Sequence, residues 1–151
     1  MNPNELRNRC VGSIVGFGIG DALGMPAAFL SRDQIRRYYG KPIAGFIKAH
    51  PGHASDFLPE GSYTDNTQTM LATAECLIEC KKMEPARHAD ALLSWFANTV
   101  PHRTPSTANL RACQHLSTGR PWNKSGVFSC GCSAAMRMTP IGLFFNRVPE
   151  T

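Results

Sequence analysis

The sequence predicts an all-α fold, and three observations support this prediction. Apolar residues recur every three to four positions after residue 64, which places them on one face of a helix. Residues typical of helix ends, such as Thr64, Pro85 and Gly119, stand where such patterns begin or stop. We find no convincing stretch that alternates apolar and polar residues as a half-buried β-strand does. We therefore expect a chain built from helices and loops.

The composition is that of one folded domain, which we expect to cover residues 1–151. A chain of 151 residues has the usual size of a single domain. Apolar residues make up 42% and charged residues 18%, a balance that argues against disorder. The formal net charge is +5, but the basic residues are scattered, and a solvated helix face explains the small cluster at 32–41. A nucleic-acid partner is therefore the less favoured interpretation of the charge.

The first helix is expected within residues 10–30, which are almost uncharged. Glycines recur there every four residues, namely at Gly12, Gly16, Gly20 and Gly24. Such a ridge suits close packing in a membrane, and it equally suits a buried helix of a soluble bundle. Asp21 is costly in lipid, and Pro26 breaks the helix before it is long enough to span. We therefore expect a buried helix in a cytoplasmic protein that does not associate with membranes.

The helices of the middle of the chain follow from their end signals. Residues 34–39 form a short helix in this prediction, and residues 41–59, rich in Pro, Gly and His, form a loop. The next helix starts at Pro85, and its apolar stripe consists of Ala89, Leu92, Leu93 and Phe96. Another begins near 104–106 and ends at Gly119, and its inward residues are Ala108, Ala112, Cys113 and Leu116.

The last part of the chain is predicted as a loop and one helix. Residues 120–129 are expected to form the loop, and the helix starts at about Ser133, with Pro140 bending or ending it. The six cysteines show no repeated spacing typical of a metal site. Cys76 and Cys80 lie one helical turn apart and can share a soft metal, although small core residues are the favoured interpretation.

Residues 61–70 carry the strongest functional pattern, a turn that runs into a helix. Thr64 suits the N-cap, Asp65 and Asn66 fall in the first turn, and one apolar face follows, formed by Met70, Leu71, Ala74, Leu77 and Ile78. An acidic residue at this point is favoured by the helix dipole, so the group can simply be a well-capped helix start. Hydroxyl, carboxylate and amide oxygens side by side also suit a hard cation such as Mg²⁺. Both interpretations stay open on spacing alone.

Two further segments accompany this one in the chain. Residues 20–26 read GDALGMP, and residues 130–143 read CGCSAAMRMTPIGL. In this order, the three segments resemble the ADP-ribosylglycohydrolase family, whose patterns are GDALG-x-P, G-x-YTDDTQ-x and GNGAAMR-x-x-P-x-G. The resemblance covers essentially the whole chain, but only the N-terminal half of a family member. It implies a compact orthogonal helical bundle, here truncated to a fragment.

The resemblance also implies a function and a set of site residues. The function is Mg²⁺-dependent hydrolysis that removes ADP-ribose from an ADP-ribosylated protein or from a related ADP-ribosyl or N-glycosidic small molecule. Thr64, Asp65 and Asn66 match the ligands of a pair of Mg²⁺ ions, and Asp65 is the candidate catalytic residue. The substrate-binding residues that it implies are Asp21, Ser129, Cys130, Gly131, Cys132 and Ser133. A loop before a helix N-terminus suits a pyrophosphate, because its N–H groups attract anions.

The chain departs from the family pattern at several positions. Asn66 replaces a second aspartate, Ala27 and Ala28 stand where many members have an acid, and Cys132 and Ser133 replace Asn-Gly. The family's second set of metal ligands lies in a C-terminal half that this chain does not match. We therefore expect weak Mg²⁺ binding by the chain alone, and exposed apolar surface.

Two hypotheses about function follow from these departures. The chain is a hydrolase completed by a C-terminal polypeptide or by self-association, or it is a non-catalytic remnant that binds an ADP-ribose-like ligand or a partner protein. A basic nucleic-acid-binding protein is a weaker third hypothesis, and steep salt dependence of DNA binding would favour it.

Overall fold

The computed structural model of the protein describes residues 2–98 and 102–146. All regular structure in these residues is helical, which confirms the all-α prediction. The first part holds α1 (Pro3–Gly24), a 3₁₀ turn η1 (Met25–Ala27) and α2 (Arg32–Tyr39), followed by a long loop. The remaining helices are α3 (Asp65–Cys80), α4 (Pro85–Asn98), α5 (Thr107–Ser117), α6 (Trp122–Ser125), α7 (Ser133–Met136) and α8 (Thr139–Phe144).

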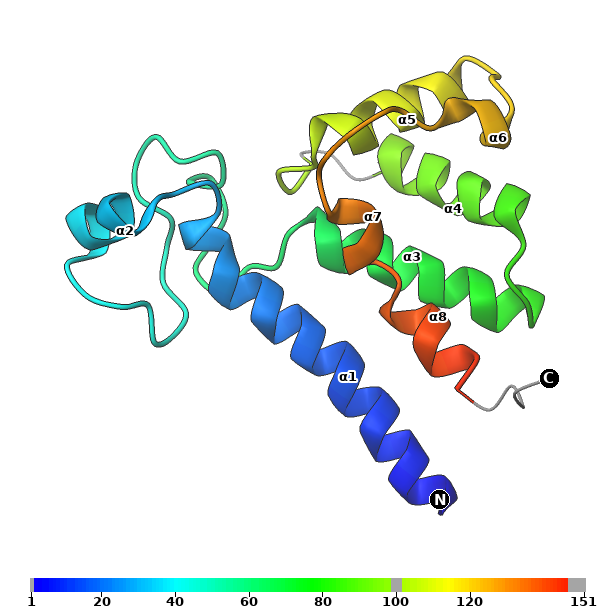
Figure 1. Ribbon diagram of the computed structural model, residues 1–151, viewed down its shortest axis with the longest axis horizontal. Helices are drawn as coiled ribbons and strands as arrows, with labels where there is room; N and C mark the ends of the chain where they lie inside the picture. Colours follow the sequence, from blue (N-terminus) through cyan, green and yellow to red (C-terminus); the bar gives the residue numbers. More distant parts are fainter. Residues whose placement is uncertain (1, 99–101, 147–151) are drawn as a thin grey trace.

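Helix α3 is the central element of the fold. It packs against α4 on one side and against α7 and α8 on another, and α4 packs in turn against α5 (Figure 1). Helix α1 meets α3 and α8 and carries the 3₁₀ turn at its C-terminal end, beside which α2 and the long loop lie (Figure 1). The N-terminal end of α3 contacts the end of α1 through Asp21 and α5 through Asn109.

The boundaries of α3 agree with the signals in the sequence. Thr64 is its N-cap, and the Thr64 side chain accepts a hydrogen bond from the N–H of Asn66 at 3.3 Å. The helix ends at Lys81, whose φ of 56° is left-handed and stops the regular hydrogen bonding. The predicted N-cap is confirmed, because a hydroxyl there satisfies an N–H that has no partner inside the helix.

The buried face of α3 differs from the predicted one. Met70 and Leu77 are buried as expected, but Ile78 is 61% exposed, and the face also includes Thr69 and Thr73. Each of these hydroxyls donates a hydrogen bond to the carbonyl four residues earlier, at 2.8 and 2.9 Å. Because the hydroxyls are satisfied within their own helix, burying them costs little. Apolar spacing could not reveal this, since threonine is counted as polar.

Helix α1 forms as predicted but is not buried by the described residues. Ala22 is its one buried residue, and Val11 and Val15 are 51% and 53% exposed. A Cβ atom added at Gly12 or Gly16 would meet nothing within 4 Å, so no described residue packs closely on the glycine ridge. The predicted burial is therefore wrong for most of α1, because no packed partner covers that face.

The first helix also meets the length and composition criteria of a membrane span over Pro3–Ala27. Such criteria are met equally by core helices of soluble proteins and by signal sequences. Within this span, the Asp21 carboxylate accepts hydrogen bonds from Thr64 and Thr67. One end of the helix is thereby tied to α3.

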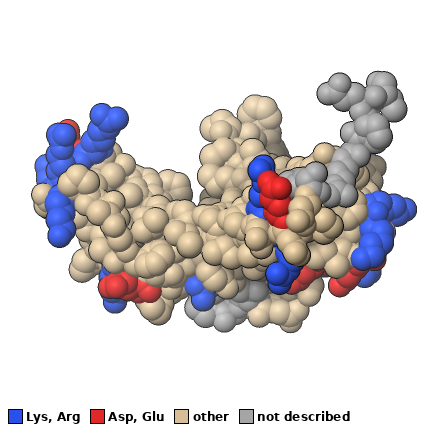
Figure 2. Space-filling view, turned by 90° about the horizontal axis from the view of Figure 1, so that it is seen from below, with Lys and Arg blue, Asp and Glu red and all other residues tan. Residues whose placement is uncertain are grey.

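The chain exposes more surface than a compact protein of its mass. Its accessible surface is 9775 Å², whereas the scaling for compact monomers at this mass gives roughly 7,600 Å². Figure 2 shows charged side chains at both ends of the molecule and in smaller groups near its middle, separated by uncharged surface. Large apolar side chains such as Phe29 and Phe128 are exposed, at 91% and 103%. This agrees with the expectation of exposed apolar surface, which favours association.

The C-terminal part is divided into more helices than predicted. Helix α6 lies inside the segment predicted as a loop, and the predicted single helix after Ser133 is two short ones, α7 and α8. Pro140 is the second residue of α8, so it starts a helix instead of ending one. A proline fits that position because the first residues of a helix have no N–H partner to lose.

The helices and loops around α3 keep several predicted signals. Ser106 caps α5 and Gly119 follows α5 with a φ of 80°, as expected. Ser31, which was not predicted as a cap, forms a capping box at the start of α2, so this helix begins two residues before the predicted 34. The predicted loop at 41–59 has no regular helix or strand. It is nevertheless anchored, because His53 is 8% exposed and its ring contacts a backbone carbonyl of residue 28 at 2.9 Å.

Candidate functional site

Asp21 joins the end of α1 to the start of α3. Its carboxylate accepts hydrogen bonds from the Thr64 N–H at 2.8 Å and the Thr64 hydroxyl at 2.7 Å. It also accepts from the Thr67 N–H at 3.2 Å and the Thr67 hydroxyl at 2.7 Å. A carboxylate at the N-terminus of a helix meets both unpaired N–H groups and the positive end of the helix dipole. Asp21 therefore fixes the position of the predicted cation-binding turn.

Replacing Asp21 by asparagine is expected to lower the free energy of unfolding by about 2 kcal/mol, since the amide nitrogen cannot accept the hydrogen bonds that one carboxylate oxygen receives. Urea unfolding at pH 7.5, followed by circular dichroism, measures this change.

The matched control is Asp33→Asn on α2, where the carboxylate is 89% exposed and its ion pair to Arg36 spans 3.7 Å. That control is expected to change the free energy by less than about 0.5 kcal/mol. Equal effects of the two substitutions would show that Asp21 does not hold the turn.

Asp65 is turned into the protein at the first position of α3. It is 3% exposed, and its N–H donates a hydrogen bond to the carbonyl of Arg103 at 2.9 Å. Its Oδ2 atom accepts a hydrogen bond from the side-chain amide of Asn109 at 3.0 Å. The carboxylate that the sequence places at a helix tip is thus held by α5.

Asn109 and Arg137 complete this buried group, and neither was predicted as a site residue. Arg137 is 9% exposed. It donates one hydrogen bond to the side-chain amide oxygen of Asn109 and another to the backbone carbonyl of Ser133, the latter at 3.3 Å. A signal for Asn109 does exist, because it falls on the inward face of α5 beside Ala108 and one turn before Cys113. A buried amide in an apolar stripe needs a polar partner.

The surroundings of Asp65 make its ionisation unfavourable. The pKa of Asp65 is raised to about 6, mainly because the carboxyl is buried and also because of the nearby Asp21 charge, while the Asn109 hydrogen bond and the Arg137 charge partly offset the increase. Burial also lowers the pKa of Arg137, which nevertheless stays charged at neutral pH. A carboxylate with such a pKa is ionised at pH 7.5, and a bound cation would further stabilise its ionised form.

The oxygens beside Asp65 face a cavity of about 420 Å³. Asp21, Thr64 and Asn66 line it, together with the glycine face of α1 and Met136 of α7. The Asn66 side-chain nitrogen donates a hydrogen bond to the Thr64 hydroxyl at 3.1 Å. The structure therefore gathers three of the predicted site residues at one cavity, whereas Asp65 is not among the residues that line it.

The predicted phosphate-binding loop lies at a neighbouring cavity. Ser129, Gly131 and Ser133 line this second space of about 580 Å³, opposite the exposed rings of Phe29 and Phe57. The Gly131 N–H donates to the Ser129 hydroxyl at 3.1 Å, so the loop turns on itself. The loop also holds the exposed thiols Cys130 and Cys132, which agrees with their prediction as loop residues.

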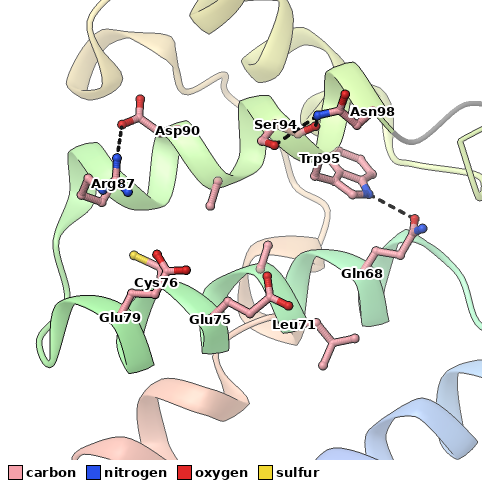
Figure 3. A pocket seen from close by; sticks show the side chains of 12 residues that line it. Gln68, Leu71, Glu75, Cys76, Glu79, Arg87, Asp90, Ser94, Trp95 and Asn98 are labelled. Carbon is pink, nitrogen blue, oxygen red and sulfur yellow. Dashed lines mark hydrogen bonds and ion pairs between the residues drawn. The ribbon is translucent and has the colours of Figure 1, made fainter.

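The other cysteines and the groove between α3 and α4 are separate from this site. Cys76 is buried in α3, as its core interpretation predicts, and it lines a groove of about 600 Å³ that is shown in Figure 3. In that groove Trp95 donates a hydrogen bond to Gln68 at 3.1 Å. None of the predicted site residues lines the groove.

The predicted Mg²⁺ site offers oxygen donors of three kinds. Thr64, Asp65 and Asn66 supply hydroxyl, carboxylate and amide oxygens, the ligand types that hard cations prefer. Their number is small, since among residues 2–98 and 102–146 no three acidic, histidine or cysteine side chains cluster as metal ligands. The residues fit the kind of ion, but Asp65 does not line the cavity that Thr64 and Asn66 face, and the three do not complete a six-oxygen shell. Water, substrate or other residues would have to supply the remaining ligands.

Fold and site define an all-α protein in which an oxygen-rich helix N-terminus is linked to a loop of small residues at 129–133, here called the small-residue loop. Residues 2–151 match the family model of ADP-ribosylglycohydrolase. The chain belongs to the ADP-ribosylglycohydrolase family.

Several known proteins are similar to this chain in sequence. An uncharacterized protein of Archaeoglobus fulgidus is 38% identical over 133 residues, which cover 88% of this chain and 42% of the relative. The ADP-ribosylarginine hydrolase Tri1 of Pseudomonas putida is 26% identical, over 95% of this chain and 38% of the relative. The ADP-ribosyl-[dinitrogen reductase] glycohydrolase of Rhodospirillum rubrum is 23% identical, over 95% and 47%. The chain thus spans less than half the length of these relatives.

Proposed function

We propose that the chain contributes to an ADP-ribosyl hydrolase, cytoplasmic in location, which removes ADP-ribose from a protein or a related small molecule. The observation that carries this proposal is the hydrogen-bonded link between Asp65, at the turn matching the family's metal-binding pattern, and Ser133 of the small-residue loop, which runs through Asn109 and Arg137. The hydrolysis would require that the carboxylate site and the anion-binding loop keep a constant relative position. This link provides such a relation between them.

Within this proposal, Thr64, Asp65 and Asn66 would hold Mg²⁺. The ion would polarise ribose oxygens and lower the pKa of an attacking water. Asp21 orients the turn through its hydrogen bonds to Thr64. Backbone N–H groups of the loop at 129–133, other than that of Gly131, which donates to Ser129, would receive the pyrophosphate, whose negative charge they can bind without a lysine or arginine.

The substrate class in this proposal follows the names of the relatives. Two relatives are named as hydrolases of ADP-ribosylarginine, and another as one that acts on ADP-ribosylated dinitrogen reductase. We therefore take an ADP-ribosylated arginine side chain as the first substrate to test. The remaining metal ligands would come from a complementing C-terminal polypeptide or from a second copy of the chain.

The proposal is tested by calorimetry and by a turnover assay on the purified chain. We expect heat on titration with ADP-ribose in the presence of Mg²⁺, and no heat in the variant Asp65→Ala. The control Asp33→Ala, on exposed α2, is expected to retain the parental heat. Release of ADP-ribose from an ADP-ribosylarginine peptide would show hydrolysis directly. A chain that binds neither Mg²⁺ nor ADP-ribose would contradict the proposal.

A second candidate function is a binding module without catalysis. Asn66, which carries no charge and cannot act as a base, favours it, as does the small number of acidic ligands among the described residues. This candidate predicts heat on titration with ADP-ribose but no release of ADP-ribose from the peptide at any Mg²⁺ concentration. Asn66→Asp then distinguishes the two, since turnover that appears with the second aspartate would favour a hydrolase scaffold.

A further inference from the structure

A hydrogen-bonded chain of side chains runs from Asp65 through Asn109 to Arg137. We propose that Asn109 is a positioning residue, which holds the Asp65 carboxylate in place for a bound cation and ties it, through Arg137, to the loop that ends at Ser133. This inference rests on the proposed function, because it assigns Asn109 a role toward the same cation.

The two ends of the Asn109 amide are used differently. Its nitrogen donates to Asp65 Oδ2 at 3.0 Å, and its oxygen accepts from the Arg137 guanidinium. A guanidinium has only donors, so it can bond the amide oxygen but not the nitrogen. If the Asn109 amide rotated by 180°, its NH₂ group would face the Arg137 N–H groups and its oxygen would face the Asp65 carboxylate, so both hydrogen bonds would be lost. Its N–H therefore stays aimed at one carboxylate oxygen and leaves the other for a ligand.

Burial makes this arrangement rigid. Asn109 is 7% exposed and Arg137 is 9% exposed, so water does not readily replace either bond. The backbone at Asn109 is fixed as well, because its N–H donates to the Ser106 hydroxyl at 3.2 Å at the start of α5. Residues that orient a metal ligand in this way affect metal affinity without touching the ion.

The same contacts lead to the predicted phosphate-binding loop. Arg137 donates through Nε to the Ser133 carbonyl at 3.3 Å, and the Ser133 hydroxyl lies 3.4 Å from that of Ser106. A shift of the loop on binding an anion would move the Ser133 carbonyl and, with it, the guanidinium that holds Asn109. Cation and anion binding would then influence each other by the same factor in both directions.

The first test compares Asn109→Leu with the control Asn123→Leu on exposed α6. Leucine has a similar volume but neither donates nor accepts, so the Asp65 carboxylate would lose its fixed partner. We expect Asn109→Leu to bind Mg²⁺ about 10- to 100-fold more weakly in calorimetry, with the control unchanged. Circular dichroism and cooperative urea unfolding check that each variant is folded. Asn109→Ser replaces the leucine variant if that one does not unfold cooperatively, and the same loss is expected.

The second test does not depend on metal. The side-chain amide protons of Asn109 should exchange slowly with solvent in nuclear magnetic resonance spectra of the parent chain. Asp65→Ala should shift these resonances and speed their exchange, whereas Asp33→Ala should leave them unchanged. Asn109 side-chain amide resonances that do not change in Asp65→Ala would overturn the inference.

The outcomes separate this inference from the proposed function. A folded Asn109→Leu or Asn109→Ser chain that binds Mg²⁺ as tightly as the parent would overturn the inference and leave the proposed function intact. A parent chain that binds no Mg²⁺ would overturn the cation part of the proposed function and the positioning of a cation with it. The amide measurement would still decide whether Asn109 holds Asp65.

Discussion

Replacing Asp65 by asparagine is expected to stabilise the metal-free chain at pH 7.5 by about 3 kcal/mol, because the variant no longer pays for a buried charge. Burial raises the pKa of Asp65 to about 6 in the folded chain, from an ordinary value of 3.8. The folded state therefore binds this proton more tightly than the unfolded state does. The stability that the group contributes is fully present below pH 3.8 and is lost as the pH rises through 6.

The measurement is urea unfolding in EDTA at several pH values between 4 and 8. The difference between Asp65→Asn and the parent should be small at pH 4, where the folded parent is protonated at Asp65, and should reach its full size above pH 6. Asp33→Asn, with an exposed carboxylate, is expected to differ from the parent by less than about 0.5 kcal/mol throughout. A difference between Asp65→Asn and the parent that is independent of pH would mean that the Asp65 charge is not the cause.

Removing the Arg137 guanidinium is expected to have the largest destabilising effect among the site residues. Arg137→Met keeps the length of the side chain but leaves the buried Asp65 charge without its nearby cation and the Asn109 oxygen without a donor. Breaking such a buried group from one side costs about 3–5 kcal/mol. Urea unfolding at pH 7.5 measures the loss, and Arg36→Met on exposed α2 is the matched control.

The double variant Asp65→Asn, Arg137→Met gives the sharper result. Because Asp65→Asn alone is expected to add about 3 kcal/mol, additive effects would already return much of the stability lost in Arg137→Met. An interaction between the two buried charges predicts a double variant that differs from this sum by more than about 0.5 kcal/mol. If the two effects simply add, with no coupling between the sites, the charges of Asp65 and Arg137 do not interact across Asn109, and the described network does not act as one unit.

Much of the local structure is determined by the sequence. The start of α3 at Thr64, the cap of α5 at Ser106 and the turn at Gly119 follow from side-chain and backbone chemistry within a few residues. The loop at 41–59 and the helix from Pro85 follow in the same way. These signals are local, because an N-cap hydroxyl or a glycine satisfies its own helix end without help from the rest of the chain.

Other features depended on contacts between distant residues. The exposure of α1 could not be read from its apolar glycine-rich sequence, since burial depends on whether another element covers that face. Pro140 could end one helix or start another, and the packing of α8 against α1 and α3 decides between them. Apolar spacing also misjudged the buried face of α3, where threonines satisfy their own hydroxyl groups.

The candidate site shows the same division. The sequence by itself determined which oxygen-bearing residues stand at one helix start, and it indicated the family to which the chain belongs. The tertiary structure decided how they face: Thr64 and Asn66 line a cavity with Asp21, while Asp65 turns inward to Asn109. The physical reason is that a carboxylate removed from water must find donors and compensating charge. Those groups lie on α5 and beyond α7, far along the chain.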